Sequence, residues 1–299
     1  MMTAGDGFRA RLTGISGILV TPFDEDDRIA PARLAPVVDR AVAAGVHILV
    51  SNGNTGEFYS LAIGEALDMV AATADLVAGR APLVGGAGRS VAEACALAKA
   101  SARAGCAAIM LHQPPDPFVA PRGLVDYARR VAEAADGLPL VLYIRNDAIG
   151  TAGLAALCAV PGVVGVKWAT PNPMRLAEAM AACDPAIVWV GGLAETWAPT
   201  LCAVGARGFT SGLINVWPER SVAIHAALER QDYAEARRLI EGMRGFEEVR
   251  ADELGGANVS GVKAALRLQG IDCGPPRPPA AWPLGEGQLA RIRGVLPLG

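Results

Sequence analysis

Short apolar runs recur along the chain, and each is followed by a segment whose apolar positions have helical spacing. The runs are near-continuous and lack strict alternation, which is typical of parallel strands buried on both faces. A helical segment between successive strands indicates βαβ units. Eight strands are predicted, at residues 15–20, 46–50, 82–87, 107–111, 139–143, 163–167, 187–191 and 207–211.

The helical segments between these runs carry recognisable start and stop signals. The segment 31–45 begins with Pro31 in its expected first turn and ends at Gly45, a natural C-terminal cap. The segment 90–105 begins with Ser90 followed three residues later by Glu93, which predicts a capping box. Segments 153–160 and 172–183 fill the next two gaps between strands.

Eight strands alternating with helices predict an α/β protein with a (β/α)8 TIM barrel. Such a barrel needs about 250 residues, and residues 15–230 come close to that length. A doubly wound sheet is the alternative fold. Its support is weaker because the only Gly-rich strand-to-helix turn, "GGAGRS" at 85–90, lacks the GxGxxG pattern, and no acidic residue is placed to hold a ribose.

Beyond residue 230 the pattern changes to helices alone. Helical segments are predicted at 232–250, 258–270 and 285–296, and the Pro-rich interval 273–283 separates the last two. We therefore predict a catalytic barrel over residues 1–230 and a helical C-terminal extension over 231–299, packed on the barrel.

The composition narrows the class of partner. Of 299 residues, 52% are hydrophobic and 19% charged, with a net charge of −3 and no run of basic residues. This argues against nucleic acid and anionic membranes as partners and favours a small molecule. The first residues lack the apolar stretch of a signal peptide, and no run approaches the ~18 apolar residues of a spanning helix. We expect a cytoplasmic protein.

Cysteine and histidine give little support for a disulfide framework or a metal site. The six cysteines lie far apart without a CxxC pair, and we interpret them as buried free thiols. The three histidines, His47, His112 and His225, are isolated, and neither HExxH nor a Cys/His cluster is present. His112 ends an apolar run, where it is either a polar neighbour of the site or a catalytic group.

Lys167 closes the apolar run "PGVVGVKW" and is one of only three lysines in the chain. Burial disfavours the ammonium form and frees a nucleophilic amine near neutral pH, which points to Schiff-base chemistry. The alternative is that this lysine extends to solvent at the end of its strand.

Other residues with suitable chemistry follow the predicted strands, and the active site of a TIM barrel lies at the C-terminal ends of its strands. The turn Gly53–Gly56 offers small residues and polar donors whose backbone N–H groups suit a carboxylate, although it is also compatible with a plain turn. A hydroxyl near the amine moves protons as carbinolamine becomes imine. The residues at the strand ends are Gly53, Asn54, Thr55, Gly56, Tyr143, Lys167, Gly191, Gly192, Thr210 and Ser211.

The chain resembles the dihydrodipicolinate synthase and N-acetylneuraminate lyase superfamily of class I aldolases. The motifs that carry the resemblance are "GILVTPFDEDDRI", "GNTGEFYSL", "PLVLYIRN", "VVGVKWA" and "GARGFTSGLINVWPE", which together cover nearly the whole chain. The resemblance implies a (β/α)8 barrel with a helical C-terminal extension, a homo-oligomer of four or two copies, and no metal or organic cofactor.

The same resemblance implies roles for individual residues. Lys167 is the Schiff-base lysine, which forms a covalent imine with a 2-oxo acid, and Tyr143 is the proton-relay tyrosine. Thr55 matches the relay hydroxyl, and Asn54 and Thr55 lie where the substrate carboxylate is held. Thr210 and Ser211 match strand-eight residues that line the 2-oxo acid site.

The subfamily is indicated by departures from the lysine-biosynthesis synthase. That synthase has a carboxylate-binding arginine where this chain has Ala148, and a tyrosine in the loop where this chain has Asp116 nearest the expected place. Arg145, two residues after Tyr143, resembles the 5-dehydro-4-deoxyglucarate dehydratase branch. Trp168 departs from that branch, in a loop expected to face the distal end of the substrate.

The sequence therefore predicts a lyase that acts on a 2-oxo acid, a dehydratase or aldolase of a deoxy-sugar acid. Arg145 either holds a distal carboxylate or hydroxyl of the substrate or forms an ion pair at the rim of the site. Two alternatives remain open. One is a pyruvate-dependent aldolase or a dihydrodipicolinate synthase-type condensation; the other is a ligand-binding barrel without turnover.

Overall fold

A computed structural model describes residues 4–116 and 118–297, and its strands form a closed barrel. The eight strands follow one another around the barrel in chain order, and the registers from β3 to β8 are all parallel. The strands are β1 Ile15–Ile18, β2 Ile48–Ser51, β3 Leu83–Ala87, β4 Ala108–His112, β5 Leu140–Ile144, β6 Val163–Trp168, β7 Val188–Gly191 and β8 Gly208–Ser211. The predicted (β/α)8 barrel and all eight strands are confirmed.

The chain divides into two compact units, which we describe separately. The first comprises the residues up to Ser16 together with Pro82–Thr210, and the second comprises Gly17–Ala81 together with Ser211 onward. Neither limit coincides with residue 230. The division into a barrel over 1–230 and an extension over 231–299 stays a prediction.

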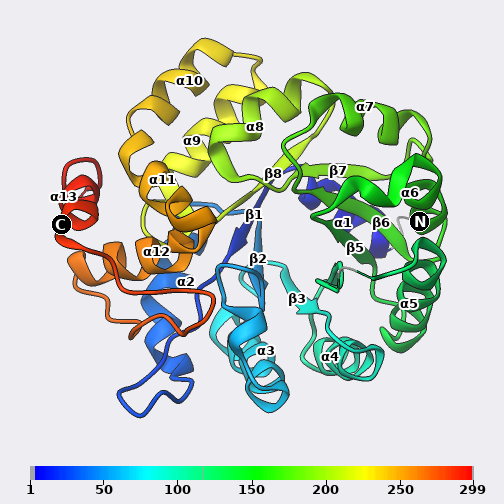
Figure 1. The fold of residues 1–299 in the computed structure, drawn as a ribbon, viewed down its shortest axis with the longest axis horizontal. Helices are drawn as coiled ribbons and strands as arrows, with labels where there is room; N and C mark the ends of the chain where they lie inside the picture. Colours follow the sequence, from blue (N-terminus) through cyan, green and yellow to red (C-terminus); the bar gives the residue numbers. More distant parts are fainter. Residues whose placement is uncertain (1–3, 117, 298–299) are drawn as a thin grey trace. The chain divides into compact units, whose positions relative to one another are not determined.

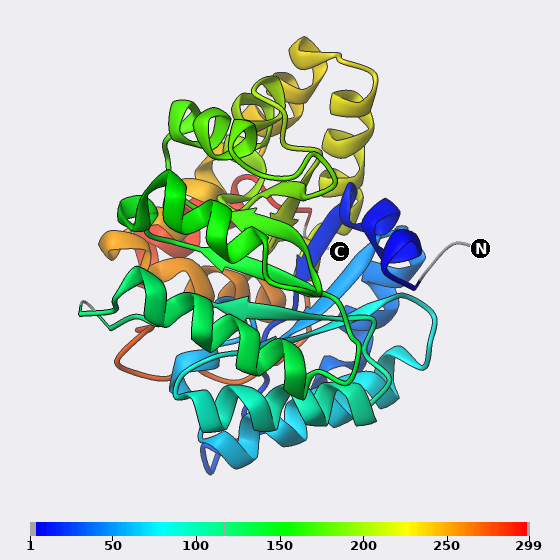
Figure 2. The same cartoon turned by 90° about the vertical axis from the view of Figure 1, so that its right-hand side faces the viewer.

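The first unit alternates strands β3 to β8 with five helices that lie on the outer side of the strands (Figure 1; Figure 2). The predicted capping box at Ser90 is present: the Glu93 backbone N–H donates to the Ser90 Oγ at 3.2 Å, and the Glu93 carboxylate accepts from the Ser90 N–H at 3.2 Å. The helices are α4 Val91–Arg103, α5 Pro121–Ala134, α6 Gly150–Cys158, α7 Pro173–Ala181 and α8 Ala194–Ala203.

One helix of this unit was not predicted. Helix α1, Ala4–Leu12, precedes the first strand and buries Phe8 and Leu12. The Leu12 side chain packs so closely on β6 that a Cβ on Gly165 would lie 2.5 Å from its Cδ2. The helix has only these few apolar positions, too few for a periodic pattern, and its stability comes from tertiary packing.

The second unit contains the remaining helices. The predicted helical segment 232–250 is two helices in the structure, because the chain turns at Gly242 and Met243. Helices α10 and α9 contact each other, as do α11, α12 and α13 (Figure 1). The helices are α2 Ala35–Ala43, α3 Ile63–Val77, α9 Pro218–Glu229, α10 Tyr233–Glu241, α11 Arg244–Ala251, α12 Ala257–Leu268 and α13 Glu286–Arg293, and short 3-10 turns of this unit lie at Pro31–Leu34, Phe58–Ser60, Leu213–Asn215 and Glu253–Gly255. The first unit has a 3-10 turn at Asp147–Ile149.

The cysteines are free thiols, as predicted, but only half of them are buried. Cys106, Cys158 and Cys273 are buried, whereas the other three are partly exposed. Cys106 lies just before β4, and Cys158 is the last residue of α6. Burial raises the pKa of the Cys106 thiol to about 11. Within the described ranges, no helix combines the length and apolar character that crossing a membrane requires.

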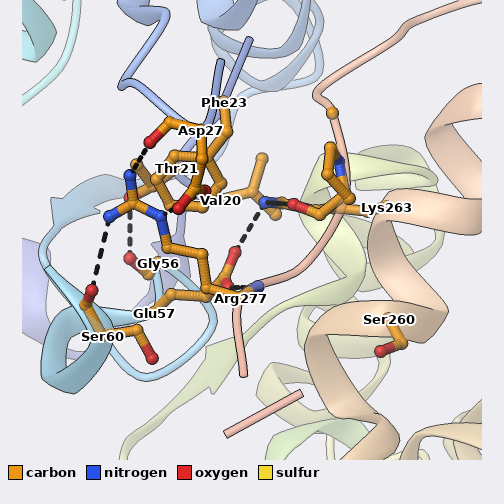
Figure 3. A network of polar contacts seen from close by, with 12 residues as sticks. Val20, Thr21, Phe23, Asp27, Gly56, Glu57, Ser60, Ser260, Lys263 and Arg277 are labelled. Atoms are coloured by element: carbon orange, nitrogen blue, oxygen red, sulfur yellow. Dashed lines mark hydrogen bonds and ion pairs between the residues drawn. The ribbon is translucent and has the colours of Figure 1, made fainter. Parts of the chain in front are cut away.

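A buried ion pair anchors the turn after β2 to the C-terminal helices of the second unit (Figure 3). The Lys263 Nζ on α12 lies 2.6 Å from the Glu57 Oε1, and the two side chains are 2% and 0% exposed. The Lys263 amine also donates to the Pro275 carbonyl at 3.0 Å. Burial raises the pKa of Glu57 and lowers the pKa of Lys263, and each charge opposes the shift of the other.

Arg277, within the Pro-rich interval, extends this network. Its backbone N–H donates to the Glu57 Oε2 at 2.7 Å, so one carboxylate bonds to both α12 and the Pro-rich interval. Its guanidinium lies 2.7 Å from the Asp27 carboxylate and donates to both carboxylate oxygens of Glu65, at 2.8 and 2.9 Å. Two segments distant in sequence are thus held together by charge-assisted hydrogen bonds.

Phe23, in the segment that follows β1, contacts both cations of this network. Its ring lies 4.2 Å from the Lys263 Nζ and 3.9 Å from the Arg277 guanidinium carbon, both within cation–π range. The Thr21 hydroxyl nearby donates to the Gly56 carbonyl at 2.6 Å (Figure 3). The backbone around Gly56 and Glu57 is therefore fixed from several directions.

We predict that Glu57→Gln lowers the free energy of unfolding by about 3 kcal/mol, because it leaves the Lys263 ammonium buried without its counter-charge. Glu57→Gln combined with Lys263→Met removes both charges and recovers part of that loss. Urea unfolding measures both changes. Glu25→Gln is the control, since Glu25 pairs with Arg33 at 2.8 Å but is 81% exposed, and we expect less than about 1 kcal/mol there. Equal losses in the two single variants would contradict this prediction.

Candidate active site

Three side chains form a row on one face of the sheet, at the C-terminal ends of neighbouring strands in the first unit. His112 on β4 is the register partner of Tyr143 on β5, and Tyr143 is the register partner of Lys167 on β6. Register partners in a parallel sheet point to the same face. The two residues for which the sequence predicts imine chemistry and proton relay, Lys167 and Tyr143, are therefore adjacent.

The Lys167 amine is buried without a hydrogen-bonding partner among the residues described. The residue is 4% exposed, and its Nζ lies 3.8 Å from the centroid of the Tyr143 ring. Burial, with a smaller contribution from the Arg145 guanidinium, lowers the pKa of Lys167 to about 7. A large fraction of the side chain is the neutral, nucleophilic amine at neutral pH. The alternative of a solvent-extended lysine does not fit this position.

His112 packs against the relay tyrosine. It is fully buried, and its ring centroid lies 5.2 Å from that of Tyr143, in a tilted arrangement. This contact places His112 beside the Tyr143 ring, and its role as a polar neighbour or a catalytic group stays a prediction.

Arg145 lies just beyond β5 and its side chain is exposed. The segment that carries it is held by Gln113, whose side-chain carbonyl accepts from the backbone N–H of Arg145 and of Asn146, at 2.8 Å each. A cavity of about 370 Å³ lies between the segments that follow β4 and β5, and Arg145, Ala148 and Asp116 are among its lining residues. Residue 117, in the same loop as Asp116, lies outside the described residues.

The two predicted residues at the end of β8 point to opposite faces. Val190 is the register partner of both Lys167 and Gly208, so Thr210, two residues after Gly208, points to the same face as Lys167. The Thr210 residue is 5% exposed. Ser211 points to the other face, where its Oγ lies 3.0 Å from the Ser221 Oγ and accepts from the Ile214 N–H at 3.2 Å. The Ser211 hydroxyl thus has partners within the protein.

Gly192, after β7, approaches the end of β6 closely. Its N–H donates to the Trp168 carbonyl at 2.6 Å, and a Cβ at this position would lie 2.7 Å from that oxygen. This N–H is therefore used within the protein. The predicted role of Gly192 in substrate binding therefore stays a prediction. Because its N–H is already used, that role would come from the space that the absent side chain leaves.

The predicted anion-binding turn lies in the second unit. The N–H groups of Gly56 and Phe58 donate to the Gly53 carbonyl, at 3.0 and 3.4 Å, and that of Glu57 to the Asn54 carbonyl at 3.0 Å. Thr55 is 4% exposed, and neither its N–H nor its hydroxyl has a partner in the part of the chain that the structure describes. Thr55 therefore keeps donors that a ligand can use, and the carboxylate-binding role of the turn stays a prediction.

Trp168 does not face the substrate as predicted for its loop. It is the last residue of β6, points to the face opposite Lys167, and is fully buried. Its ring meets that of Trp189 edge-on, with centroids 6.1 Å apart. Strand β6 therefore extends to Trp168, one residue beyond the predicted strand 163–167.

The arrangement combines a buried amine whose pKa is lowered to about 7, a tyrosine ring beside it and the Thr210 side chain on the same face. His112, which the sequence singled out, lies beside Tyr143. Gln113, which holds the Arg145 segment, was not predicted, because nothing in its sequence context distinguishes it. The functional roles predicted for the strand-end residues stay predictions.

We predict that Lys167→Met raises the free energy of unfolding at neutral pH by a few kcal/mol. The amine has a pKa of about 7 in the folded protein and an ordinary value of 10.5, so the unfolded chain binds the proton more tightly. The penalty to the wild type is complete below about pH 7 and disappears as the pH rises towards 10.5. The gain of the variant should shrink over the same window in urea titrations. Lys99→Met, at an exposed position, should show no such trend; a pH-independent gain would contradict the prediction.

Comparisons with known proteins place these features in a family. The model of the dihydrodipicolinate synthetase family matches residues 11–292. A relative from Streptomyces coelicolor, named "Probable 5-dehydro-4-deoxyglucarate dehydratase 1", is 34% identical over 289 residues, which are 93% of this chain and 91% of the relative. A similarly named relative from Rhizobium rhizogenes is 30% identical over 89% of each chain. The crystal structure of dihydrodipicolinate synthase from Bacillus clausii superposes with a TM-score of 0.92 at 34% identity, covering 96% of this chain and 98% of that one. The chain belongs to the dihydrodipicolinate synthetase family and is a lyase of the class I aldolase superfamily.

Proposed function

We propose that this lyase forms a Schiff base with a 2-oxo acid derived from a sugar acid and eliminates water from it, as a 5-dehydro-4-deoxyglucarate dehydratase does. The observation that carries the proposal is the Lys167 amine. It is buried and unpaired within the described residues, and its pKa is lowered to about 7. An amine in this state is a nucleophile for a ketone at neutral pH.

The first step is attack of the neutral Lys167 Nζ on the 2-oxo carbon. The C–N bond forms, the carbonyl oxygen takes up a proton to give the carbinolamine, and that hydroxyl leaves as water to give the iminium. Tyr143 and Thr55 are proposed to carry the protons. Tyr143 is suited to this role because its ring lies directly beside the amine, 3.8 Å from the Nζ to the centroid.

The second step uses the iminium as an electron sink. Loss of a proton from the adjacent C3 gives an enamine, and the electron pair then expels the β-hydroxyl, which leaves as water after protonation. The distal carboxylate then leaves as carbon dioxide, because the electron pair of its C–C bond passes through the new C=C bond to the iminium nitrogen. Protonation of the resulting dienamine, tautomerisation of the enol to an oxo group and hydrolysis of the C=N bond by water would release a dioxo acid and restore the amine. No other co-reactant is needed, consistent with the prediction that the enzyme needs no organic cofactor and no metal.

The distal subsite supports a dehydratase over a synthase-type condensation. Ala148, where the resemblance to the synthase calls for arginine, lines the same cavity as Arg145. Arg145 can therefore supply a positive charge to a distal carboxylate or hydroxyl there. The names of the relatives from Streptomyces coelicolor and Rhizobium rhizogenes agree with this choice, whereas that of the Bacillus clausii structure favours condensation.

Retro-aldol cleavage is the second candidate, because it uses the same iminium. Product analysis separates the two reactions: cleavage yields pyruvate, and dehydration yields a dioxo acid. Assembly into a homo-oligomer of two or four copies and a cytoplasmic location stay predictions.

We predict that incubation with pyruvate and cyanoborohydride adds one reduced adduct per chain, and that peptide mass mapping places it on Lys167. Lys167→Met should form no adduct. Lys263 serves as an internal control, because it is a second buried lysine but is paired with Glu57. An adduct on Lys263 or Lys99, or none at all, would overturn the assignment.

We also predict the pH dependence of adduct formation. At low pyruvate concentration the trapping rate should rise with pH through a midpoint near 7, the pKa of Lys167, because only the neutral amine attacks. Arg145→Gln removes a cation that lowers this pKa, so the midpoint should move to higher pH. A midpoint unchanged by Arg145→Gln would show that the guanidinium does not act on the amine.

A further inference from the structure

Gln113, the residue that follows β4, binds the backbone of two residues with both ends of its side-chain amide. Its Oε1 accepts from the N–H groups of Arg145 and Asn146, at 2.8 Å each, and its Nε2 donates to the Asn146 carbonyl at 3.0 Å. A glutamine side chain offers one carbonyl acceptor and one NH2 donor group. Both groups are engaged here with the two residues that follow β5.

These bonds continue the pairing of β4 with β5 beyond its last register pair. That pair is His112 and Tyr143, and the Gln113 N–H still donates to the Tyr143 carbonyl at 3.1 Å. From there the Gln113 side chain takes the place of a further strand residue, since it presents an acceptor and a donor to the neighbouring backbone. The backbone of Arg145 is therefore fixed relative to the sheet, although this residue lies outside β5.

A second side chain fixes the chain just after this point. The Asn146 Oδ1 accepts from the Ala148 N–H at 2.9 Å, at the start of the 3-10 turn Asp147–Ile149. Arg145 thus lies in a short link between two ordered stretches, the end of β5 and this turn. Gln113 bonds directly to that link.

The position of this backbone matters for the site, because Arg145 and Gln113 line the same cavity of about 370 Å³. Sites for small molecules usually have about 300–1,000 Å³. The Arg145 guanidinium also lowers the pKa of Lys167, so it acts on the reactive amine. A long side chain presents its charge in one place only when its own backbone is held, and misplacement of a binding group by about 1 Å can cost about 100-fold in rate.

We propose that Gln113 is a positioning residue for Arg145 and thereby sets the preference of the enzyme for 2-oxo acids that carry a second, distal carboxylate. The inference rests on the proposed function, because it takes the ligand to be an acid that forms the imine on Lys167. It goes further in naming the residue that places the Arg145 guanidinium. Gln113 acts through the backbone of Arg145 and not through a contact with the substrate.

The experiment compares two ligands that differ at their distal end. Pyruvate has no distal group, whereas 2-oxoadipate carries a carboxylate at its far end and, lacking a β-hydroxyl, cannot lose water. The readout is the concentration of each ligand that gives half-maximal cyanoborohydride trapping on Lys167. The ratio of the two concentrations measures the preference for the distal carboxylate. Both ligands react with the same amine at the same pH, so a change in its pKa cancels from the ratio.

The variants are Gln113→Met, Arg145→Gln, the double variant Gln113→Met/Arg145→Gln and the control Gln269→Met. Methionine has nearly the shape of glutamine but makes none of the three bonds to the segment after β5. Gln269, in the second unit, makes three side-chain bonds of its own, one from Arg40 and two to backbone carbonyls, at 2.9 to 3.0 Å. The control therefore removes three bonds of the same kind with the same substitution.

We expect Gln113→Met to reduce the preference for 2-oxoadipate by about fivefold and Arg145→Gln by about tenfold or more, as loss of a charge-assisted hydrogen bond does. The double variant should be no worse than Arg145→Gln, because a residue that acts only through Arg145 has no effect once the guanidinium is gone. Gln269→Met should keep the wild-type preference.

A wild-type preference in Gln113→Met would overturn the inference, and so would losses in the two single variants that add up in the double variant. A wild type that traps pyruvate but does not prefer 2-oxoadipate would also overturn it, while the proposed function would stand. Thermal melting identifies a variant that does not fold. Gln113→Asn, which keeps an amide but is one methylene group shorter, then takes the place of Gln113→Met.

If the wild type forms no adduct on Lys167 with either ligand, the proposed function fails, and ligand-observed NMR of 2-oxoadipate binding decides the role of Gln113. Binding that is weakened in Gln113→Met, and no weaker in the double variant than in Arg145→Gln, supports the positioning role. Equal binding to wild type and Gln113→Met, or no binding at all, overturns it.

Discussion

Within the described residues, no carboxylate lies beside the Lys167 amine. The low pKa of this amine, on which the proposed imine chemistry depends, follows from that absence together with burial. An ammonium group at this depth loses its hydration, and the ring of Tyr143 alone does not replace it. The proton is therefore held weakly, and the loss of hydration that destabilises the charged form also favours the neutral amine. Under the proposed function, Lys167 costs the fold stability and provides the nucleophile.

Lys263 shows what happens when the partner is present. It is as deeply buried as Lys167, but Glu57 lies 2.6 Å away and Pro275 accepts a further hydrogen bond. That lysine serves architecture: it joins α12 and the Pro-rich interval to the turn that carries Thr55. The chain thus uses two buried lysines for opposite purposes, and the neighbouring acid makes the difference.

The barrel could be predicted because its strands are buried on both faces, so that most of them appear in the sequence as short, nearly continuous apolar runs. Lys167 and Tyr143 were predictable for the same reason, since a polar residue closing such a run is conspicuous. The buried pair of Lys263 and Glu57 was not predictable, because only the folded chain shows that these two charged residues are buried together. Helix α1, which depends on packing against β6, and the outward direction of Ser211 also required three-dimensional information.

The pair of indoles at Trp168 and Trp189 has a practical consequence. Trp168 is adjacent in sequence to Lys167, is fully buried, and has no partner for its indole N–H among the described residues. Its indole is therefore shielded from solvent. Under the proposed mechanism the charge on the neighbouring residue changes when the imine forms, so Trp168, one of five tryptophans in the chain, is placed to report on that step through its fluorescence.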